Sequence, residues 1–141
     1  MQVLEIISFE HGKSQNIPLL LQPVSAGKPI PADSEIDKYI DLNEFLVEHP
    51  AGTFFAKVNG DSLKSIGISD GDILVVDTIR APMNNNLVIV TINDELTVRV
   101  YKEIDGEIIL QTHLDQFIPL KIGDSFEYMI EGVITKSIHS Y

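Results

Sequence analysis

One serine and one distant basic residue are the side chains of this sequence that could carry covalent chemistry. Ser62 follows Gly60 and Asp61 in a turn-like stretch, and Arg99 lies in a later run, Leu96–Tyr101, that is typical of a strand. A serine on a tight turn, with a basic residue arriving from a distant strand, is the arrangement of a Ser/Lys peptidase. The basic residue here is arginine, so the pattern indicates a fold more firmly than an activity.

The residues around Ser62 predict an exposed hydroxyl near free backbone donors. A short helical turn from Ser62 to Ile66, closed by Gly67, would follow the serine. The first N–H groups of a helix have no partner within it, so they could face a developing oxyanion. A plain turn in which Asp61 or Ser62 caps the helix is the other interpretation. The Gly-x-Ser-x-Gly elbow of α/β hydrolases is absent, because Lys64 takes its last position.

Composition favours one globular domain that does not bind nucleic acid directly. The chain has 141 residues, of which 44% are apolar, as is usual for a single domain. Its net charge of -11 repels phosphate backbones, so a partner should hold any nucleic acid near which the protein works. No apolar stretch is long enough to span a membrane, and the N-terminus lacks a targeting leader. We therefore expect a cytoplasmic location.

The sequence predicts neither a cofactor nor a metal. It contains no cysteine, which excludes disulfides, thiolate metal sites and cysteine nucleophiles. The four histidines are too scattered to resemble a metal-ligand motif: His11, His49, His113 and His139. A Ser-His-Asp triad that uses His113 or His49 stays an alternative, because triads are recognised by geometry and not by order in the chain.

Beyond Pro50 the sequence is typical of a mostly antiparallel β domain. Short runs rich in β-branched residues alternate there with turn residues. The expected strands cover residues 53–58, 73–77, 87–92, 96–101, 107–111 and 126–134. Because these strands do not alternate with long helices, a doubly wound parallel sheet is disfavoured. The expected fold class is therefore mostly β, with one or two short helices.

The N-terminal part is expected to differ from this β domain. Residues 1–31 should form an arm with little regular structure, and residues 32–141 the β domain. The arm is punctuated by Pro18, Pro23, Pro29 and Pro31. After it, Asp41 can cap a short helix that Glu44 completes as a capping box and Pro50 ends. Its apolar stripe would be Leu42, Phe45 and Leu46, and a polar loop is the alternative.

Four ordered blocks of sequence resemble a known family. They are Phe54–Leu63, Gly67–Asp77, Glu95–Arg99 and Glu131–Ile134. In these blocks the chain resembles the LexA/UmuD family of self-cleaving, peptidase S24-like proteins. The upstream stretches Ala26–Pro31 and Tyr39–Pro50 resemble the UmuD branch, whose members are accessory subunits of an error-prone polymerase. From its length we also expect the chain to lack the helix-turn-helix domain of LexA-like repressors.

The resemblance implies a LexA-like, signal-peptidase-like β domain in which Ser62 is the nucleophile. It would attack the Ala26–Gly27 bond of the protein's own arm, where two small residues allow a close approach to the hydroxyl. A plain flexible linker is the other interpretation of this pair. The resemblance also implies a role in the SOS response and translesion synthesis. The implied partners are a second copy of the chain, a UmuC-like polymerase subunit and a RecA filament on single-stranded DNA.

Position 99 departs from the family pattern, which has a general-base lysine there. Arginine stays protonated above about pH 12 and offers only donors, so it cannot take the proton of Ser62. Lys102 should point to the opposite face of the strand, and Lys57 and Lys64 are the other candidate bases. Three explanations stay open: a natural pseudopeptidase, a variant cleaved with another base, and a changed residue that fixes the intact form.

Two further expectations concern interactions. A non-catalytic β domain that acts only as an interaction module is the competing function, with Ser62 and Arg99 as a hydrogen-bonded structural pair. Dimerisation is implied by the family, and the C-terminal run of residues 126–139 is a candidate edge strand through which copies could pair.

Overall fold

The computed structural model describes residues 2–8, 16–20, 36–111, 120–121 and 127–141. Contacts divide the chain into two compact units, one formed by Met1–Phe9 with His49–Tyr141 and the other by Glu10–Glu48. The Ala26–Gly27 bond and His113 lie outside the described residues. No helix within the described ranges is long and apolar enough to cross a bilayer.

The larger unit is built on one antiparallel sheet, which confirms the predicted mostly β fold class. Eight strands of the described residues form this sheet. Their order is β1 (Gln2–Ser8), β4 (Thr53–Asn59), β5 (Ile73–Asp77), β10 (Tyr128–Ile138), β6 (Leu87–Ile92), β7 (Glu95–Ile104), β8 (Glu107–Gln111) and β9 (Leu120–Lys121). β5, β6 and β8 have their predicted bounds, whereas β7 and β10 extend further along the chain than predicted.

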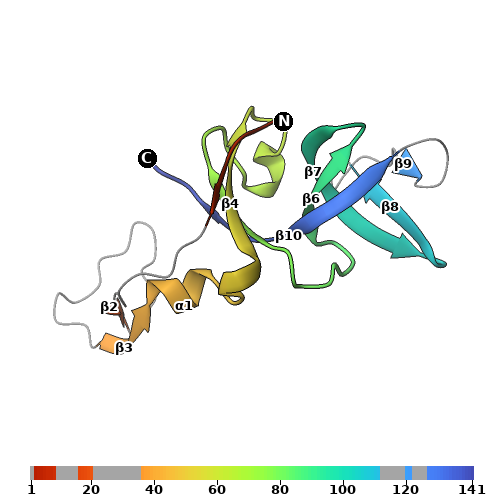
Figure 1. Ribbon diagram of the computed structural model, residues 1–141. Coiled ribbons are helices and arrows are strands. Elements are labelled where there is room, and N and C mark those ends of the chain that lie inside the picture. The colour runs from red at the N-terminus through yellow and green to blue at the C-terminus, as the bar shows by residue number, and fades with distance from the viewer. Residues whose placement is uncertain (1, 9–15, 21–35, 112–119, 122–126) are drawn as a thin grey trace. The chain divides into compact units, whose positions relative to one another are not determined.

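Strand β10 joins the two halves of this sheet (Figure 1). Its first part pairs with β6 and its last part pairs with β5. The register shifts in both pairings, at residues 130–132 toward β6 and at residues 134–136 toward β5. Such shifts bend a strand and increase its twist, so one strand can serve both halves. Because β10 lies between β5 and β6 in the strand order, the prediction that the C-terminal run is an edge strand was wrong, and residues 133–134 pair on both sides.

Buried apolar side chains form two clusters in this unit. The first contains Ala56, Val58, Leu63, Ile68, Leu74, Val76, Ile89 and Val98. The second contains Val88, Val90, Tyr101, Leu110 and Val133. Ile89 of β6 belongs to the first cluster, whereas its neighbours Val88 and Val90 belong to the second. Successive side chains of a strand point to opposite faces, so the two clusters lie on opposite faces of β6.

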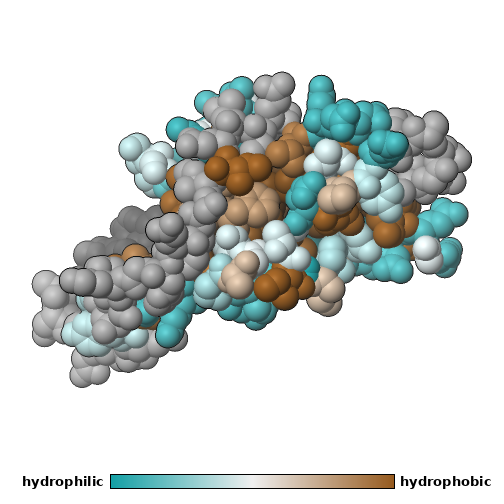
Figure 2. All heavy atoms as spheres, in the orientation of Figure 1, coloured by the Kyte–Doolittle hydropathy of each residue, from teal (hydrophilic) through white to brown (hydrophobic). Residues whose placement is uncertain are grey.

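Some large apolar side chains remain on the surface. Figure 2 shows brown spheres among teal ones on the face that it draws. The exposed members within the larger unit include Ile6, Ile79, Met83, Ile104 and Met129. They come from four separate parts of the chain, and scattered apolar residues are ordinary on a protein surface.

Strands in the N-terminal part correct the prediction that residues 1–31 have little regular structure. β1 pairs antiparallel with β4. In the smaller unit, β2 (Asn16–Leu20) pairs antiparallel with β3 (Ile36–Asp41). Pro18 is compatible with β2, because in a two-stranded sheet one side of the backbone needs no hydrogen-bond donor.

The helices of the described residues are short. α1 (Leu42–Leu46) begins as predicted after Asp41, whose carboxylate accepts a hydrogen bond from the Asn43 N–H. It buries none of its side chains, so the predicted apolar stripe does not face a core. The 3-10 helices η1 (Pro50–Gly52) and η2 (Lys64–Ile66) flank β4. Pro50 therefore begins η1, a position that its fixed φ suits, and α1 has already ended.

Gly132 allows β10 to approach β5 closely. A Cβ atom at this position would lie 2.7 Å from Val76 Cγ1 and 2.9 Å from the carbonyl oxygen of Asp77. We expect Gly132→Ala to lower the free energy of unfolding by about 1–3 kcal/mol, because added atoms in a packed sheet force neighbouring groups apart. Urea denaturation measures the loss, with Ser137→Ala at an exposed position of β10 as the control. Unchanged stability of Gly132→Ala would contradict this close packing.

Candidate functional site

Ser62 lies on a hydrogen-bonded loop between β4 and β5. The loop closes at Val58, whose N–H donates to the Asp72 carbonyl at 3.0 Å and whose carbonyl accepts from the Gly71 N–H at 2.9 Å. Ser62 is exposed, whereas the next residue, Leu63, is buried in the first apolar cluster. The leucine therefore anchors the loop to the core while the serine stays accessible.

Carboxylates and glycines fix the shape of this loop. The Gly60 N–H donates to Asp70 Oδ1 at 2.8 Å, and the Asp70 N–H donates to Asp61 Oδ1 at 3.3 Å. Gly60 has a φ of 97° and Gly67 a φ of 89°, conformations that are strained for residues with a side chain. Gly67 ends η2, as the sequence predicted.

The loop leaves donors available beside Ser62. Among the residues that the structure describes, the Ser62 hydroxyl and the backbone N–H groups of Ser62 and Leu63 make no hydrogen bond. Backbone donors close to a serine can hold the oxyanion that forms when the hydroxyl attacks a carbonyl. The loop is therefore compatible with a nucleophilic serine, but no described residue accepts a hydrogen bond from its hydroxyl.

Arg99 lies in β7 and is partly buried. Its Nη1 donates to Thr97 Oγ1 at 2.8 Å and to the Val98 carbonyl at 3.0 Å. Thr97 and Arg99 share a face of β7, because side chains alternate along a strand. Burial lowers the pKa of the Arg99 guanidinium from its ordinary value. That ordinary value is far above neutral pH, so Arg99 remains a cation at neutral pH.

The fold brings the segments that carry Ser62 and Arg99 to the same core cluster. Their chain neighbours Leu63 and Val98 are both members of the first cluster. The two side chains are nevertheless not hydrogen bonded to each other, since Nη1 of Arg99 bonds to its own strand. The hydrogen-bonded Ser62–Arg99 pair of the competing hypothesis is therefore not present.

None of the three candidate lysines is placed to act as the general base for Ser62 in place of residue 99. β7 pairs with β6 and β8 without a register shift, so no bulge alters the alternation of its side chains. Lys102 consequently lies on the face opposite to Arg99. Lys57 and Lys64 are exposed, and neither forms a hydrogen bond with Ser62.

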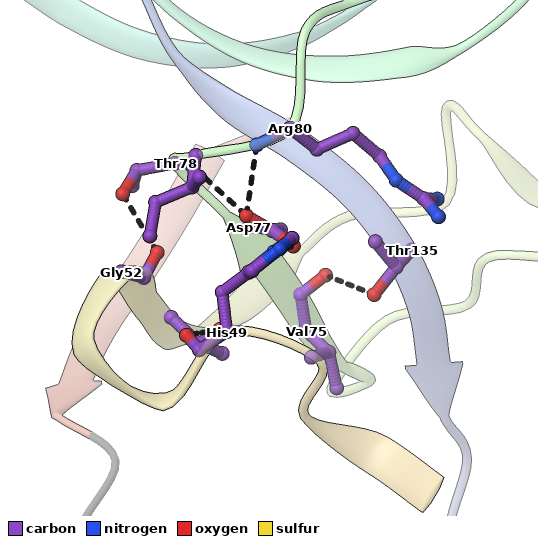
Figure 3. Close-up of polar contacts among 9 residues, drawn as sticks. His49, Gly52, Val75, Asp77, Thr78, Arg80 and Thr135 are labelled. Carbon is purple, nitrogen blue, oxygen red and sulfur yellow. Dashed lines mark hydrogen bonds and ion pairs between the residues drawn. The ribbon is translucent and has the colours of Figure 1, made fainter.

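A buried aspartate at the end of β5, which the sequence did not single out, pairs with a histidine. The Asp77 carboxylate lies 2.6 Å from His49 Nδ1 and accepts hydrogen bonds from the N–H groups of Ile79 at 2.8 Å and Arg80 at 3.0 Å (Figure 3). Asp77 is only 2% exposed. A buried carboxylate requires such partners, and the long sequence separation of His49 and Asp77 gives no local signal for the pair.

A second buried aspartate precedes the other end of β5. The Asp72 carboxylate lies 2.5 Å from His139 Nδ1 and accepts a hydrogen bond from the Ser69 N–H at 2.8 Å. Asp72 is 1% exposed. The pair therefore ties the loop that carries Ser62 to the chain just beyond β10.

The His49–Asp77 pair resembles two members of a Ser-His-Asp triad. Among the described residues no serine hydroxyl bonds to the His49 ring, and the Thr53 hydroxyl donates to the His49 backbone carbonyl at 2.7 Å. The pair therefore has no nucleophile within the described residues, and we interpret it as structural.

Hydrogen bonding keeps both buried carboxylates ionised. Burial raises the pKa of Asp77, but its hydrogen bonds outweigh burial and bring the pKa below the ordinary value. Burial likewise raises the pKa of Asp72, and its hydrogen bonds outweigh burial, so this pKa is also lowered. A carboxyl whose pKa is lowered by folding contributes stability above its unfolded pKa, and this stability is lost as pH falls through the folded pKa.

The sequence matches one known family over most of its length. Residues 18–135 match the family model described as Peptidase S24-like. The chain is 32% identical to the LexA repressor of Shewanella sp. strain ANA-3 over 128 residues, which are 90% of this chain and 61% of that protein. It is 35% identical to the LexA repressor of Psychromonas ingrahamii over 125 residues, which are 88% of this chain and 59% of that protein.

The matches cover only part of each relative and carry only the family name. The chain spans 59–61% of the length of the two relatives. Both carry the name LexA repressor, so the comparisons support the predicted LexA/UmuD family, whereas the more specific likeness to UmuD rests on the sequence blocks.

The ionised Asp77 can be tested by amide substitution. We expect Asp77→Asn to lower the free energy of unfolding at pH 7 by about 1–3 kcal/mol, because the buried hydrogen bonds lose a charged acceptor. The difference from the unaltered chain should shrink as pH falls through the lowered pKa of folded Asp77, since the carboxyl is then protonated and both side chains are neutral. Urea denaturation across this range measures it, with exposed Asp94→Asn as the control. A loss that is equal at every pH would contradict an ionised Asp77.

Proposed function

The chain belongs to the peptidase S24-like family, and we propose that it is a UmuD-like member that serves a translesion DNA polymerase during the SOS response to DNA damage. The stretches Ala26–Pro31 and Tyr39–Pro50 support the UmuD branch. The net charge of -11 supports an indirect role at nucleic acid, because such a chain repels phosphate backbones and needs a partner to reach them.

The accessible serine carries this proposal. In it, Ser62 is the nucleophile and Ala26–Gly27 is the bond that it attacks in the protein's own arm. The exposed hydroxyl and the unbonded N–H groups beside it support an arm-binding cleft at the Ser62 loop, and the shared cluster of Leu63 and Val98 packs this loop against β7. The arm would lie in this cleft while uncut, and its cleavage or release would uncover a surface for partners.

Arg99 is expected to stall the self-cleavage step. A buried lysine can lose its proton and then act as a base, whereas a guanidinium at neutral pH only donates hydrogen bonds. Residue 99 is also held by neutral acceptors of its own strand, Thr97 and Val98, and not by Ser62. This contact favours a second candidate function, a non-catalytic interaction module of the same family fold.

The proposed partners follow from the family. They are a second copy of the chain, a UmuC-like polymerase subunit and a RecA filament on single-stranded DNA, all acting in the cytoplasm. No direct DNA contact, membrane, metal or cofactor belongs to the proposal.

Restoring lysine separates the two functions. We expect Arg99→Lys to cut its own chain after Ala26 at mildly alkaline pH, faster with an activated RecA filament, because a desolvated amine can take the Ser62 proton. The unaltered chain should stay unbroken under the same conditions. Intact-mass spectrometry measures both, and it locates the break.

The matched control is the double variant Ser62→Ala with Arg99→Lys, which should remain intact because it lacks the nucleophile. Cleavage of that control would assign the chemistry to another residue or to a contaminating protease. If Arg99→Lys stays whole with a RecA filament present, the proposed roles of Ser62 and the Ala26–Gly27 bond are wrong.

The polymerase role is tested separately from cleavage. We expect the unaltered chain to co-elute in size-exclusion chromatography with a purified UmuC-like polymerase subunit, because the family role is one of association. The control is the peptidase S24-like domain of a LexA repressor, which should not co-elute. If neither the intact chain nor the cleaved Arg99→Lys form co-elutes with the polymerase subunit, the UmuD-like assignment is wrong. The assignment to the peptidase S24-like family would still hold.

A further inference from the structure

A pocket lies where the turn between β6 and β7 meets the start of β10. Its volume is about 260 Å³, and its lining residues are Thr91, Asp94, Glu127, Tyr128, Met129 and Glu131. Thr91 and Met129 are directly opposite in the pairing of β6 with β10, so their side chains share a face of the sheet. The Asn93 N–H donates to the Glu127 carbonyl at 3.1 Å. Main-chain hydrogen bonds therefore hold the two walls of the pocket together.

Three of the lining side chains are carboxylates without a counter-charge. Asp94, Glu127 and Glu131 form no ion pair with any described residue, and no lining residue is basic. Within the described part of the chain, their one side-chain hydrogen bond comes from the Thr91 hydroxyl, which donates to Glu131 Oε1 at 2.8 Å. Like charges around one pocket repel each other, so a cation that enters it is attracted by all three.

The spacing of these carboxylates does not suit a small metal ion. A hard cation such as Ca²⁺ needs several oxygens at about 2.3–2.6 Å from the ion. The ligand oxygens of Asp94, Glu127 and Glu131 do not all lie within 4.8 Å of one another. Met129 lines the same pocket and is exposed, and its thioether is not a ligand for hard cations. The pocket therefore suits a larger cation that carries an apolar stem.

We propose that this pocket binds the side chain of an arginine or a lysine from a partner polypeptide. Both side chains join an apolar stem to a cationic head. The stem would pack on Met129, because methionine adapts its shape to what it contacts. The head would lie among the three carboxylates, and the net charge of -11 adds a longer-range attraction for a basic partner. Arginine should bind better than lysine, since its five donors can reach more than one carboxylate.

The probe is the peptide Gly-Gly-Arg-Gly-Gly, acetylated and amidated so that the guanidinium is its only charge. Its counterpart has citrulline, an uncharged group of the same shape, in place of arginine. The chain has three methionines, so methyl-labelled Met129 can be followed by NMR, with exposed Met83 between β5 and β6 as an internal control. The arginine peptide should shift the Met129 signal saturably and leave the Met83 signal unmoved.

The citrulline peptide should bind about 5-fold or more weakly to the unaltered chain, because its hydrogen bonds to the carboxylates are no longer between opposite charges. Added salt should weaken the arginine peptide and reduce this difference. The comparison needs no variant, so it does not depend on whether a variant folds.

Charge-removing variants assign the effect to the pocket. Asp94→Asn, Glu127→Gln and Glu131→Gln should each weaken the arginine peptide by about 2–5-fold, the usual effect of losing one partly exposed ion pair. Glu107→Gln, which removes an exposed carboxylate at the start of β8, should bind as the unaltered chain does. Circular dichroism checks that each variant is folded.

Four outcomes would overturn the inference. They are no shift of the Met129 signal with the arginine peptide, equal binding of the arginine and citrulline peptides, equal shifts at Met129 and Met83, and an equal loss in Glu107→Gln. Calcium chloride that moves the Met129 signal at or below the concentrations of the arginine peptide would assign the pocket to a metal ion instead. All these measurements use the uncut chain, so they are independent of whether Arg99→Lys cuts itself.

Discussion

The buried carboxylates of Asp72 and Asp77 hold both ends of β5, and the candidate site depends on this constraint. Asp72 fixes the end of the Ser62 loop through the Ser69 N–H and ties it to His139 beyond β10. Asp77 ties the other end of the strand to His49, just before β4. A carboxylate buried without partners is strongly unfavourable. Burial of the ends of β5 therefore requires that these hydrogen bonds form. The loop of Ser62 therefore has one shape, set from both ends of its neighbouring strand.

The fold and the chemistry of this chain depend on different residues. Leu63 and Val98 bring the Ser62 loop and β7 to one core through apolar contacts that do not involve the side chain of residue 99. A lysine or an arginine at that position is therefore compatible with the same core, although only lysine can become a neutral base. Membership of the peptidase S24-like family consequently establishes the architecture, and the activity has to be argued from the site.

Much of the β domain could be predicted from local sequence. Runs of β-branched residues bounded by turn residues gave β5, β6 and β8 their bounds, and Asp41 identified the start of α1. β1 was missed because its pairing partner, β4, is distant in the chain, and strand formation there depends on that non-local pairing. β2 was missed because a proline such as Pro18 is usually taken to interrupt a strand. In a two-stranded sheet, however, each strand has one side whose backbone N–H groups need no partner, so proline is tolerated there.

For the site, the sequence by itself determined which groups are present: an alcohol at Ser62, a permanent cation at Arg99, and no thiol. These properties belong to the covalent structure of each side chain, so no fold can change them. Only the tertiary structure decided that Arg99 bonds to Thr97 and Val98, that its Nε is buried without a partner, and that two aspartates far from their histidines form pairs. Such contacts join distant segments and depend on burial, because only a folded interior removes the water that would otherwise satisfy each donor and charge.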